Sequence, residues 1–311
     1  MIKLQKILWA DDGSNAAEKA LDISEYLARL YDSEILGVYV NYVFYPITPD
    51  YIYYKKLIDE TASKYKKRFQ KRFSKISGRV SRKNIKFKNK IIRGEVVETV
   101  NKAASENKAD LIVIGNTGHG FVSRLLIGSN AIKILKSSTL PVLSVPESFE
   151  TKKYRLKKIL VPIDVFDMNL NSLNYAIEFA LMTNSSITIL YVLPISTGVM
   201  EYPPRVKDQI FVGIENELNK LIKKAKENVE KHNSGMKHRI KKSNSLGIAI
   251  RKKYIAGMKP SRNITDYASR NNFDMIIMNS HNKGKIKELV LGSVTEEVFR
   301  TTRTPVISIR T

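Results

Sequence analysis

The stretch KILWADDGS, at residues 6–14, recurs in outline as KILVPIDVF at residues 158–166. Each copy begins with a basic residue and runs through a short apolar segment to an acid, Asp12 in the first copy and Asp164 in the second. A helical pattern follows each, AEKALDISEYLARL or SLNYAIEFALM, with apolar residues three and four apart. An apolar strand comes next, SEILGVYV or SITILYVLP. The chain therefore carries one structural plan twice.

Later landmarks repeat in the same order. ADLIVIG (109–115) is matched by FDMIIMN (273–279), and LLIGSNAIKIL (125–135) by LVLGSVTEEVF (289–299). Strands alternate with helices, and the strands are nearly continuous apolar runs, which is typical of parallel sheets covered by helices on both faces. The sequence predicts two tandem doubly wound α/β domains, at residues 1–147 and 157–311, joined by the polar stretch ESFETKKYRLK.

Composition narrows the class of protein. The 311 residues are about twice the length of a typical single domain, and 43% apolar with 27% charged residues suits a folded chain. The absence of cysteine excludes disulfides, thiolate metal sites and cysteine nucleophiles. No apolar run is long enough for a membrane helix, and Asp11 and Asp12 precede any signal-peptide core. We expect a cytoplasmic protein without a membrane span.

A glycine motif begins at the end of the apolar strand LIVIG in the first copy. Gly115, Gly118, Gly128 and Ser129 form the spacing G-x2-G-x9-G-S. Glycine permits positive φ and close backbone approach to a ligand, and the helix that starts at Ser129 offers amide groups to an anion. In open α/β sheets, ligands bind beyond the carboxyl ends of the strands, where Asp12 also lies. The glycines could serve turns alone, but the full spacing together with Asp12 favours a nucleotide site.

This combination closely resembles the universal stress protein family, in its ATP-binding branch, once in each half of the chain. The resemblance implies an adenine nucleotide alpha hydrolase-like, Rossmann-like fold. It also implies ATP or another adenine nucleotide such as AMP as ligand, with Mg as an accompanying ion. In the family the first-strand aspartate and the end of the second strand hold the nucleoside, and the glycine motif wraps ribose and phosphates. The positions implied here are Ala10, Asp12, Val38, Ile114, Gly115, Gly118, Gly128, Ser129 and Asn130.

The second copy departs from this motif. Gly292 and Ser293 are kept, but Asn279 and Asn282 stand where the two earlier glycines are expected. Asparagine tolerates left-handed backbone, yet its side chain takes up space that the family gives to the ligand. The corresponding positions are Asp164, Val192, Asn279, Asn282, Gly292 and Ser293, with His281 or Lys283 as further phosphate contacts. We interpret this copy as degenerate and structural, with a weak second site as the alternative.

Catalysis has little support in the sequence. The loop DDGSNAAE has one glycine where pyrophosphate-binding loops of PP-loop ATPases have two, and there is no GxxxxGK-S/T motif. None of the four histidines, including His119, has a metal-ligand spacing. The resemblance implies at most slow ATP hydrolysis, and we expect a stress-response regulatory or signalling module with an unnamed protein partner. It also implies that the final strands PVLSVP and PVISIR pair within the chain, as they pair across family dimers; a homodimer of whole chains stays open.

The net charge of +23 is concentrated in one element. Between Lys55 and Arg93 there are sixteen Lys and Arg residues against two acids. Residues 50–77 predict an amphipathic helix with an apolar face formed by Ile52, Leu57, Ile58, Tyr65, Phe69, Phe73 and Ile76. The bases Lys64, Lys66, Lys67, Arg68, Lys71, Arg72 and Lys75 are expected on the other faces. We favour a solvated surface without specific nucleic-acid binding; the rival is a basic interaction protein that binds nucleic acid or anionic surfaces and little nucleotide.

Overall fold

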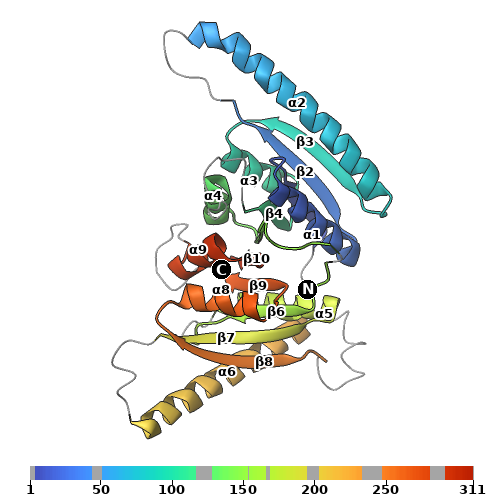
Figure 1. Ribbon diagram of the computed structural model, residues 1–311. Coiled ribbons are helices and arrows are strands. Elements are labelled where there is room, and N and C mark those ends of the chain that lie inside the picture. The colour runs from blue at the N-terminus through green and yellow to red at the C-terminus, as the bar shows by residue number, and fades with distance from the viewer. Residues whose placement is uncertain are drawn as a thin grey trace. The chain divides into compact units, whose positions relative to one another are not determined.

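The computed structural model describes residues 4–43, 51–116, 128–152, 154–165, 169–194, 203–232, 247–280 and 291–310. The chain divides into two compact units, a first unit at Leu4–Tyr154 and a second unit at Arg155–Thr311 (Figure 1). Each is an α/β unit built on a parallel sheet, as the sequence predicts.

In the first unit, the described strands are arranged in the order β3-β2-β1-β4-β5, and neighbouring strands pair in parallel. The strands are β1 (Lys6–Ala10), β2 (Glu34–Asn41), β3 (Phe87–Arg93), β4 (Leu111–Gly115) and β5 (Val142–Val145). The helices are α1 (Asn15–Tyr31), α2 (Tyr51–Ser81), α3 (Val96–Glu106) and α4 (Ser129–Ser137). This is the order of a doubly wound sheet with β1 at its centre.

The second unit repeats this order as β8-β7-β6-β9-β10. Its strands are β6 (Lys158–Pro162), β7 (Ser186–Pro194), β8 (Ile250–Gly257), β9 (Met275–Asn279) and β10 (Val306–Ile309). Its helices are α5 (Asn171–Thr183), α6 (Pro204–His232), α8 (Pro260–Arg270) and α9 (Ser293–Thr301). The internal repeat in the sequence is therefore a repeat of topology.

Local sequence explains the start of α1 and the core beneath it. Ser14 caps α1 by accepting a hydrogen bond from the Ala17 amide, at 3.1 Å. Trp9 is fully buried, donates its indole N–H to the Ala17 carbonyl at 2.8 Å, and meets the ring of Phe73 edge to face. The only tryptophan of the chain thus joins β1, α1 and α2.

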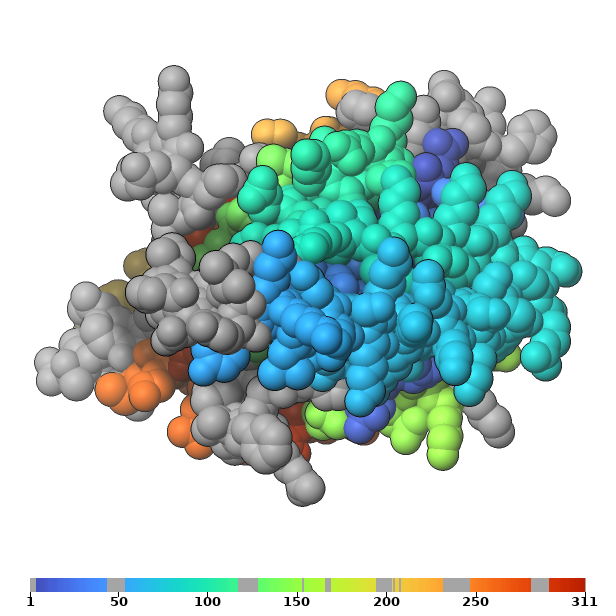
Figure 2. Space-filling model, turned by 90° about the horizontal axis from the view of Figure 1, so that it is seen from above, coloured from blue at the N-terminus to red at the C-terminus, as the bar shows by residue number. Residues whose placement is uncertain are grey.

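Helix α2 buries apolar side chains on the sheet chiefly in its later turns. Phe69, Phe73 and Ile76 are buried, as the amphipathic pattern predicts. Leu57 and Tyr65, expected on the same apolar face, are 61% and 45% exposed. The expectation was wrong for Leu57 because α2 begins beyond the end of β3, so its first turns have no sheet beneath them (Figure 1). Tyr65 follows Ala62, whose carbonyl accepts a hydrogen bond from Asn41 of β2 at 3.0 Å, so it lies beside the sheet edge and remains partly in solvent. Figure 2 shows α2, in blue to cyan, lying at the surface of its unit.

Candidate functional site

The carboxyl edge of the first sheet brings three predicted positions together. Ala10, the last residue of β1, is in register with Val38 of β2 on one side and Ile114 of β4 on the other. The Asp11 amide then donates to the Val38 carbonyl at 2.8 Å, which extends the pairing by one step. Val38 and Ile114 are buried, so this edge presents mainly backbone groups.

Asp12 lies at the turn between β1 and α1. Its side chain is exposed, and Oδ1 accepts a hydrogen bond from the Ser14 amide at 2.9 Å. Gly13, between them, has φ +79°, a left-handed conformation that favours glycine. The turn holds the Asp12 carboxylate directly beside the edge formed by Ala10, where it can accept further hydrogen bonds.

Gly115 is required by packing within the protein. A Cβ atom at this position would lie 2.6 Å from the Ala17 nitrogen and 2.7 Å from the Ala16 Cβ. The first turn of α1 therefore rests against the end of β4, and a side chain at Gly115 would push it away. Ligand approach, which the sequence suggested as the reason for this glycine, is not needed to explain it.

The start of α4 is tied to the end of β4. The Gly128 amide donates to the Asn116 carbonyl at 2.8 Å, and Asn116 directly follows Gly115. Gly128 is the N-cap of α4 and provides no side-chain cap, while Ser129 and Asn130 in the first turn are exposed. The positive end of a helix thus lies beside the same sheet edge. Gly118 and His119 lie outside the described residues.

Sequence reasoning overlooked Asp11 as a site residue. Asp11 is only 3% exposed, and its carboxylate binds Arg72 of α2 in a bidentate pair, with Nε–Oδ2 at 2.6 Å and Nη2–Oδ1 at 3.2 Å. Burial raises the pKa of Asp11, against the lowering effect of Arg72 and of a hydrogen bond from the Gly13 amide. Strand alternation is the signal that could have found this pair, because Trp9 and Asp11 point to the same face of the sheet.

Arg72 belongs to a ladder of charges between α2 and α1. It also binds Glu18 at 2.8 Å, and Arg79 binds Glu18 at 2.6 Å and Glu25 at 3.0 Å. The expectation that Arg72 lies on a solvated face was wrong, because the acids of α1 stand opposite this part of α2.

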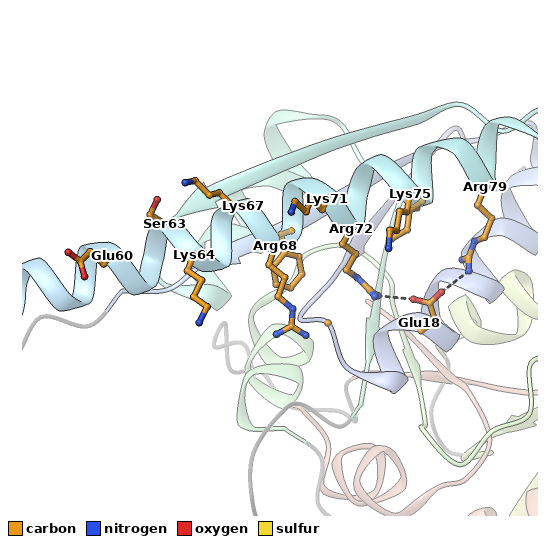
Figure 3. Close-up of a pocket in the computed structure, with 13 residues that line it drawn as sticks. Glu18, Glu60, Ser63, Lys64, Lys67, Arg68, Lys71, Arg72, Lys75 and Arg79 are labelled. Carbon is orange, nitrogen blue, oxygen red and sulfur yellow. Dashed lines mark hydrogen bonds and ion pairs between the residues drawn. The ribbon is translucent and has the colours of Figure 1, made fainter.

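A groove of about 1060 Å³ opens along α2 (Figure 3). It extends from the acids of α1 toward the earlier turns of α2, and Gly13 of the β1–α1 turn is part of its wall. The lining residues are Gly13, Glu18, Glu60, Ser63, Lys64, Lys67, Arg68, Phe69, Lys71, Arg72, Lys75, Ile76 and Arg79.

The second unit has the corresponding sheet edge, with a shift in one predicted position. Pro162 pairs with Leu190, and the Ile163 amide donates to the Leu190 carbonyl at 2.9 Å, as Asp11 does to Val38. Leu190 therefore holds the register position of Val38, and Val192 lies two residues further along β7. Counting from the first residue of each strand would have given this match. Asp164 lies exposed in the loop after β6, as Asp12 does after β1.

Asn279 occupies the place of Gly115 and uses its side chain to hold a helix. Its Oδ1 accepts from the Ser172 amide at 2.9 Å, and its Nδ2 donates to the Asn169 carbonyl at 3.1 Å. Both partners lie at the start of α5. The Gly292 amide donates to the Ser280 carbonyl at 2.9 Å, and α9 begins at Ser293, so the late glycine keeps its structural role. His281, Asn282 and Lys283 lie outside the described residues.

Neither a metal-binding cluster nor a membrane-spanning helix is found among the described residues. Within the described ranges, no group of three or more His, Cys, Asp or Glu side chains is arranged to hold a metal ion. No described helix is long and apolar enough to cross a membrane.

Comparison with known proteins gives the family. The model of the universal stress protein family matches the chain twice, at residues 3–146 and 155–310. A universal stress protein of Methanocaldococcus jannaschii is 30% identical over 166 residues, which cover 50% of this chain and 94% of that protein. A second one from the same organism is 27% identical over 145 residues, covering 45% and 81%.

A solved structure shows the same fold over the whole chain. The crystal structure of a universal stress protein from Archaeoglobus fulgidus covers 100% of this chain and 98% of its own, with a TM-score of 0.64 and 20% identity. The chain belongs to the universal stress protein family and carries the family's domain twice.

Proposed function

We propose that this universal stress protein is a regulatory module whose first unit binds an adenine nucleotide, ATP or AMP, at the carboxyl edge of its sheet. The observation that carries the proposal is the convergence of two features at that edge. Ala10 lies in register between Val38 and Ile114, and the start of α4 is tied to the end of β4 through Gly128 and Asn116.

The chemistry of the two features suits the two ends of a nucleotide. The flat backbone edge and the exposed Asp12 carboxylate offer acceptors and apolar contact to a nucleoside, whose hydroxyl and amino groups donate hydrogen bonds. The amide groups of the first turn of α4, with the Ser129 hydroxyl, offer donors to the phosphates. We assign the nucleoside to Asp12 and the phosphates to Gly128–Asn130, with Gly118 and a Mg ion as further contacts implied by the family motif.

The second unit is proposed to be a structural copy. Asn279 directs its side chain to the start of α5, where it binds both the Ser172 amide and the Asn169 carbonyl. The loss of nucleotide binding is inferred from the two asparagines, Asn279 and Asn282, that stand where the family motif has glycine. Nucleotide occupancy of the first unit alone would then set the affinity for a protein partner.

A pair of matched serine variants tests this assignment. Ser129→Ala removes one hydroxyl from the proposed phosphate contacts, and Ser293→Ala makes the same change in the second unit. We expect Ser129→Ala to weaken ATP binding by about 0.5–1.5 kcal/mol, a factor of roughly 2 to 12, because one hydrogen bond is lost. Ser293→Ala should bind as the parent does. Both affinities can be read by titration calorimetry, and equal effects of the two variants would refute the assignment.

A further inference from the structure

Helix α2 carries a row of cations of which only one half is neutralised by the protein. In the later turns, Arg72 and Arg79 face Asp11, Glu18 and Glu25 and form close ion pairs with them. Lys83 continues the row and binds Glu25. The acids of α1 thus balance this half of the helix.

The earlier half lines the groove and has no such balance. Lys64, Arg68, Lys71 and Lys75 follow one another at intervals of three or four residues, which places them on one face of the helix (Figure 3). Lys67 adds a fifth positive charge to the lining. Within the described part of the chain, no ion pair is found for these five side chains, and Glu60 is the one acid in the lining besides the paired Glu18. The stretches 44–50 and 117–127 of this unit add only Asp50 to its acids.

We propose that this groove binds the phosphodiester backbone of a single-stranded nucleic acid. Lys64 and Lys75 are separated by eleven residues, or about 16 Å of helix, so the row can meet several phosphates in succession. The groove volume of about 1060 Å³ lies at the upper end of the roughly 300–1,000 Å³ that small ligands use. A linear polyanion matches this length and this charge better than a single phosphate group.

Two features favour a single strand over a membrane surface or a duplex. The cations line a hollow whose wall includes Gly13 and the buried Phe69, and a flat lipid surface reaches only the outermost points of such a face. Tyr65, 45% exposed, lies three residues before Arg68 and one turn before Phe69, next to the residues that line the groove but not among them. Unstacked bases bind to exposed aromatic rings of this kind, while bases in a duplex are not available for stacking.

The test compares two variants that change the net charge equally. The groove variant replaces Lys64, Arg68, Lys71 and Lys75 with Gln. The control variant replaces the exposed residues Lys223, Lys224, Lys231 and Lys253 of the second unit with Gln. Fluorescence anisotropy of a labelled 20-residue oligouridylate is measured at several salt concentrations, with duplex RNA and anionic phosphatidylserine vesicles as competitors.

We expect the parent to bind the oligouridylate with a Kd on the order of micromolar at ~0.15 M salt. The groove variant should bind at least about tenfold more weakly, and its log–log salt slope should fall in magnitude by roughly 3, since each neutralised phosphate contributes about 0.7 on single strands. The control variant should retain the parent slope. Tyr65→Ala should lose about fivefold in affinity without a change of slope, because it removes a stacking surface and no charge.

Several outcomes would overturn the proposal. These are absence of binding by the parent, equal losses in the groove and control variants, and competition by duplex RNA or by vesicles that is stronger than that by unlabelled single strand. An unchanged affinity in Tyr65→Ala would contradict the assignment to a single strand. Circular dichroism checks the fold. Lys64→Gln with Lys67→Gln is a second groove variant, at two exposed residues for which no ion pair is found in the described part of the chain, and its salt slope should fall in magnitude by roughly 1.4.

Discussion

Asp11 and Asp12 are neighbours in the chain and have opposite environments. Asp12 is exposed at the β1–α1 turn and is available to a ligand, whereas Asp11 points to the other face of the strand and is buried against Arg72. The acid that the family motif marks is the exposed one. The buried one fixes α2 over the end of β1, so a binding position and a structural position stand side by side.

Arg72→Ala is expected to destabilise the first unit by about 2–3 kcal/mol. The variant leaves the fully buried Asp11 carboxylate without its cation, and breaking a buried pair in this way costs several kcal/mol, reduced here because the Arg72 side chain is 26% exposed. Urea unfolding followed by tryptophan fluorescence measures the change, since Trp9 is the only tryptophan and belongs to this unit.

Lys71→Ala is the matched control for this prediction. It removes the neighbouring cation of α2, which is exposed and forms no ion pair with any described residue, and should change the free energy of unfolding by less than about 0.5 kcal/mol. If both variants were equally stable, the Arg72–Asp11 pair would not stabilise the fold.

Gly115 and Asn279 occupy equivalent positions in the two units and contact the following helix in different ways. In the first unit α1 approaches β4 so closely that a Cβ has no room. In the second unit an asparagine side chain stands at the same position and binds the start of α5. The sequence shows that asparagine replaces glycine at this position. Whether a side chain fits there depends on the distance between the strand and the start of the helix, α1 over β4 or α5 over β9, and the sequence does not show that distance.

Helix α2 is one element with two halves of different stability. Phe69, Phe73 and Ile76 anchor the later turns, and the ion pairs with α1 reinforce them. The earlier turns carry Tyr54 and Leu57 at 54% and 61% exposure. Little apolar surface is buried there, so tertiary packing does not hold this half.

Hydrogen exchange should resolve the two halves. Amides of residues 55–64 are expected to exchange at least about tenfold faster than those of residues 70–80, because local opening of the early turns breaks few contacts. Mass spectrometry of peptides from the two halves measures the rates in the protein without nucleic acid. Equal protection along the whole helix would contradict the division at Phe69.

For helix α2, the apolar periodicity predicted the helix itself but not which parts of the protein each of its faces contacts. The rhythm of α2 identified Phe69, Phe73 and Ile76 as buried residues. It placed Leu57 and Tyr65 in the core as well, because a periodic pattern contains no information about where the sheet ends. It also placed Arg72 in solvent, because Asp11 and Glu18, which bind it, lie 61 and 54 residues away in the sequence.

For the whole molecule, the repeat KILWADDGS and KILVPIDVF predicted two doubly wound units, and the same strand order is found in both. The domain limits 1–147 and 157–311 stay a proposal. The sheet edge of the first unit was predictable because the family motif marks Ala10, Val38 and Ile114, which lie in register on three neighbouring parallel strands. The groove along α2 was not, since it depends on the packing of α2 over the β1–α1 turn.

Titration calorimetry of ATP into the intact chain, freed of bound nucleotide, tests the proposed site most directly. About one nucleotide should bind per chain, because the first unit keeps the whole motif of Gly115, Gly118, Gly128 and Ser129, whereas Asn279 and Asn282 replace the first two glycines in the second unit. Gly118→Val should abolish that binding, since a branched side chain would stand in the family's nucleotide motif. Two equivalent sites per chain, or unchanged binding in a folded Gly118→Val variant, would contradict the assignment of nucleotide binding to the first unit alone.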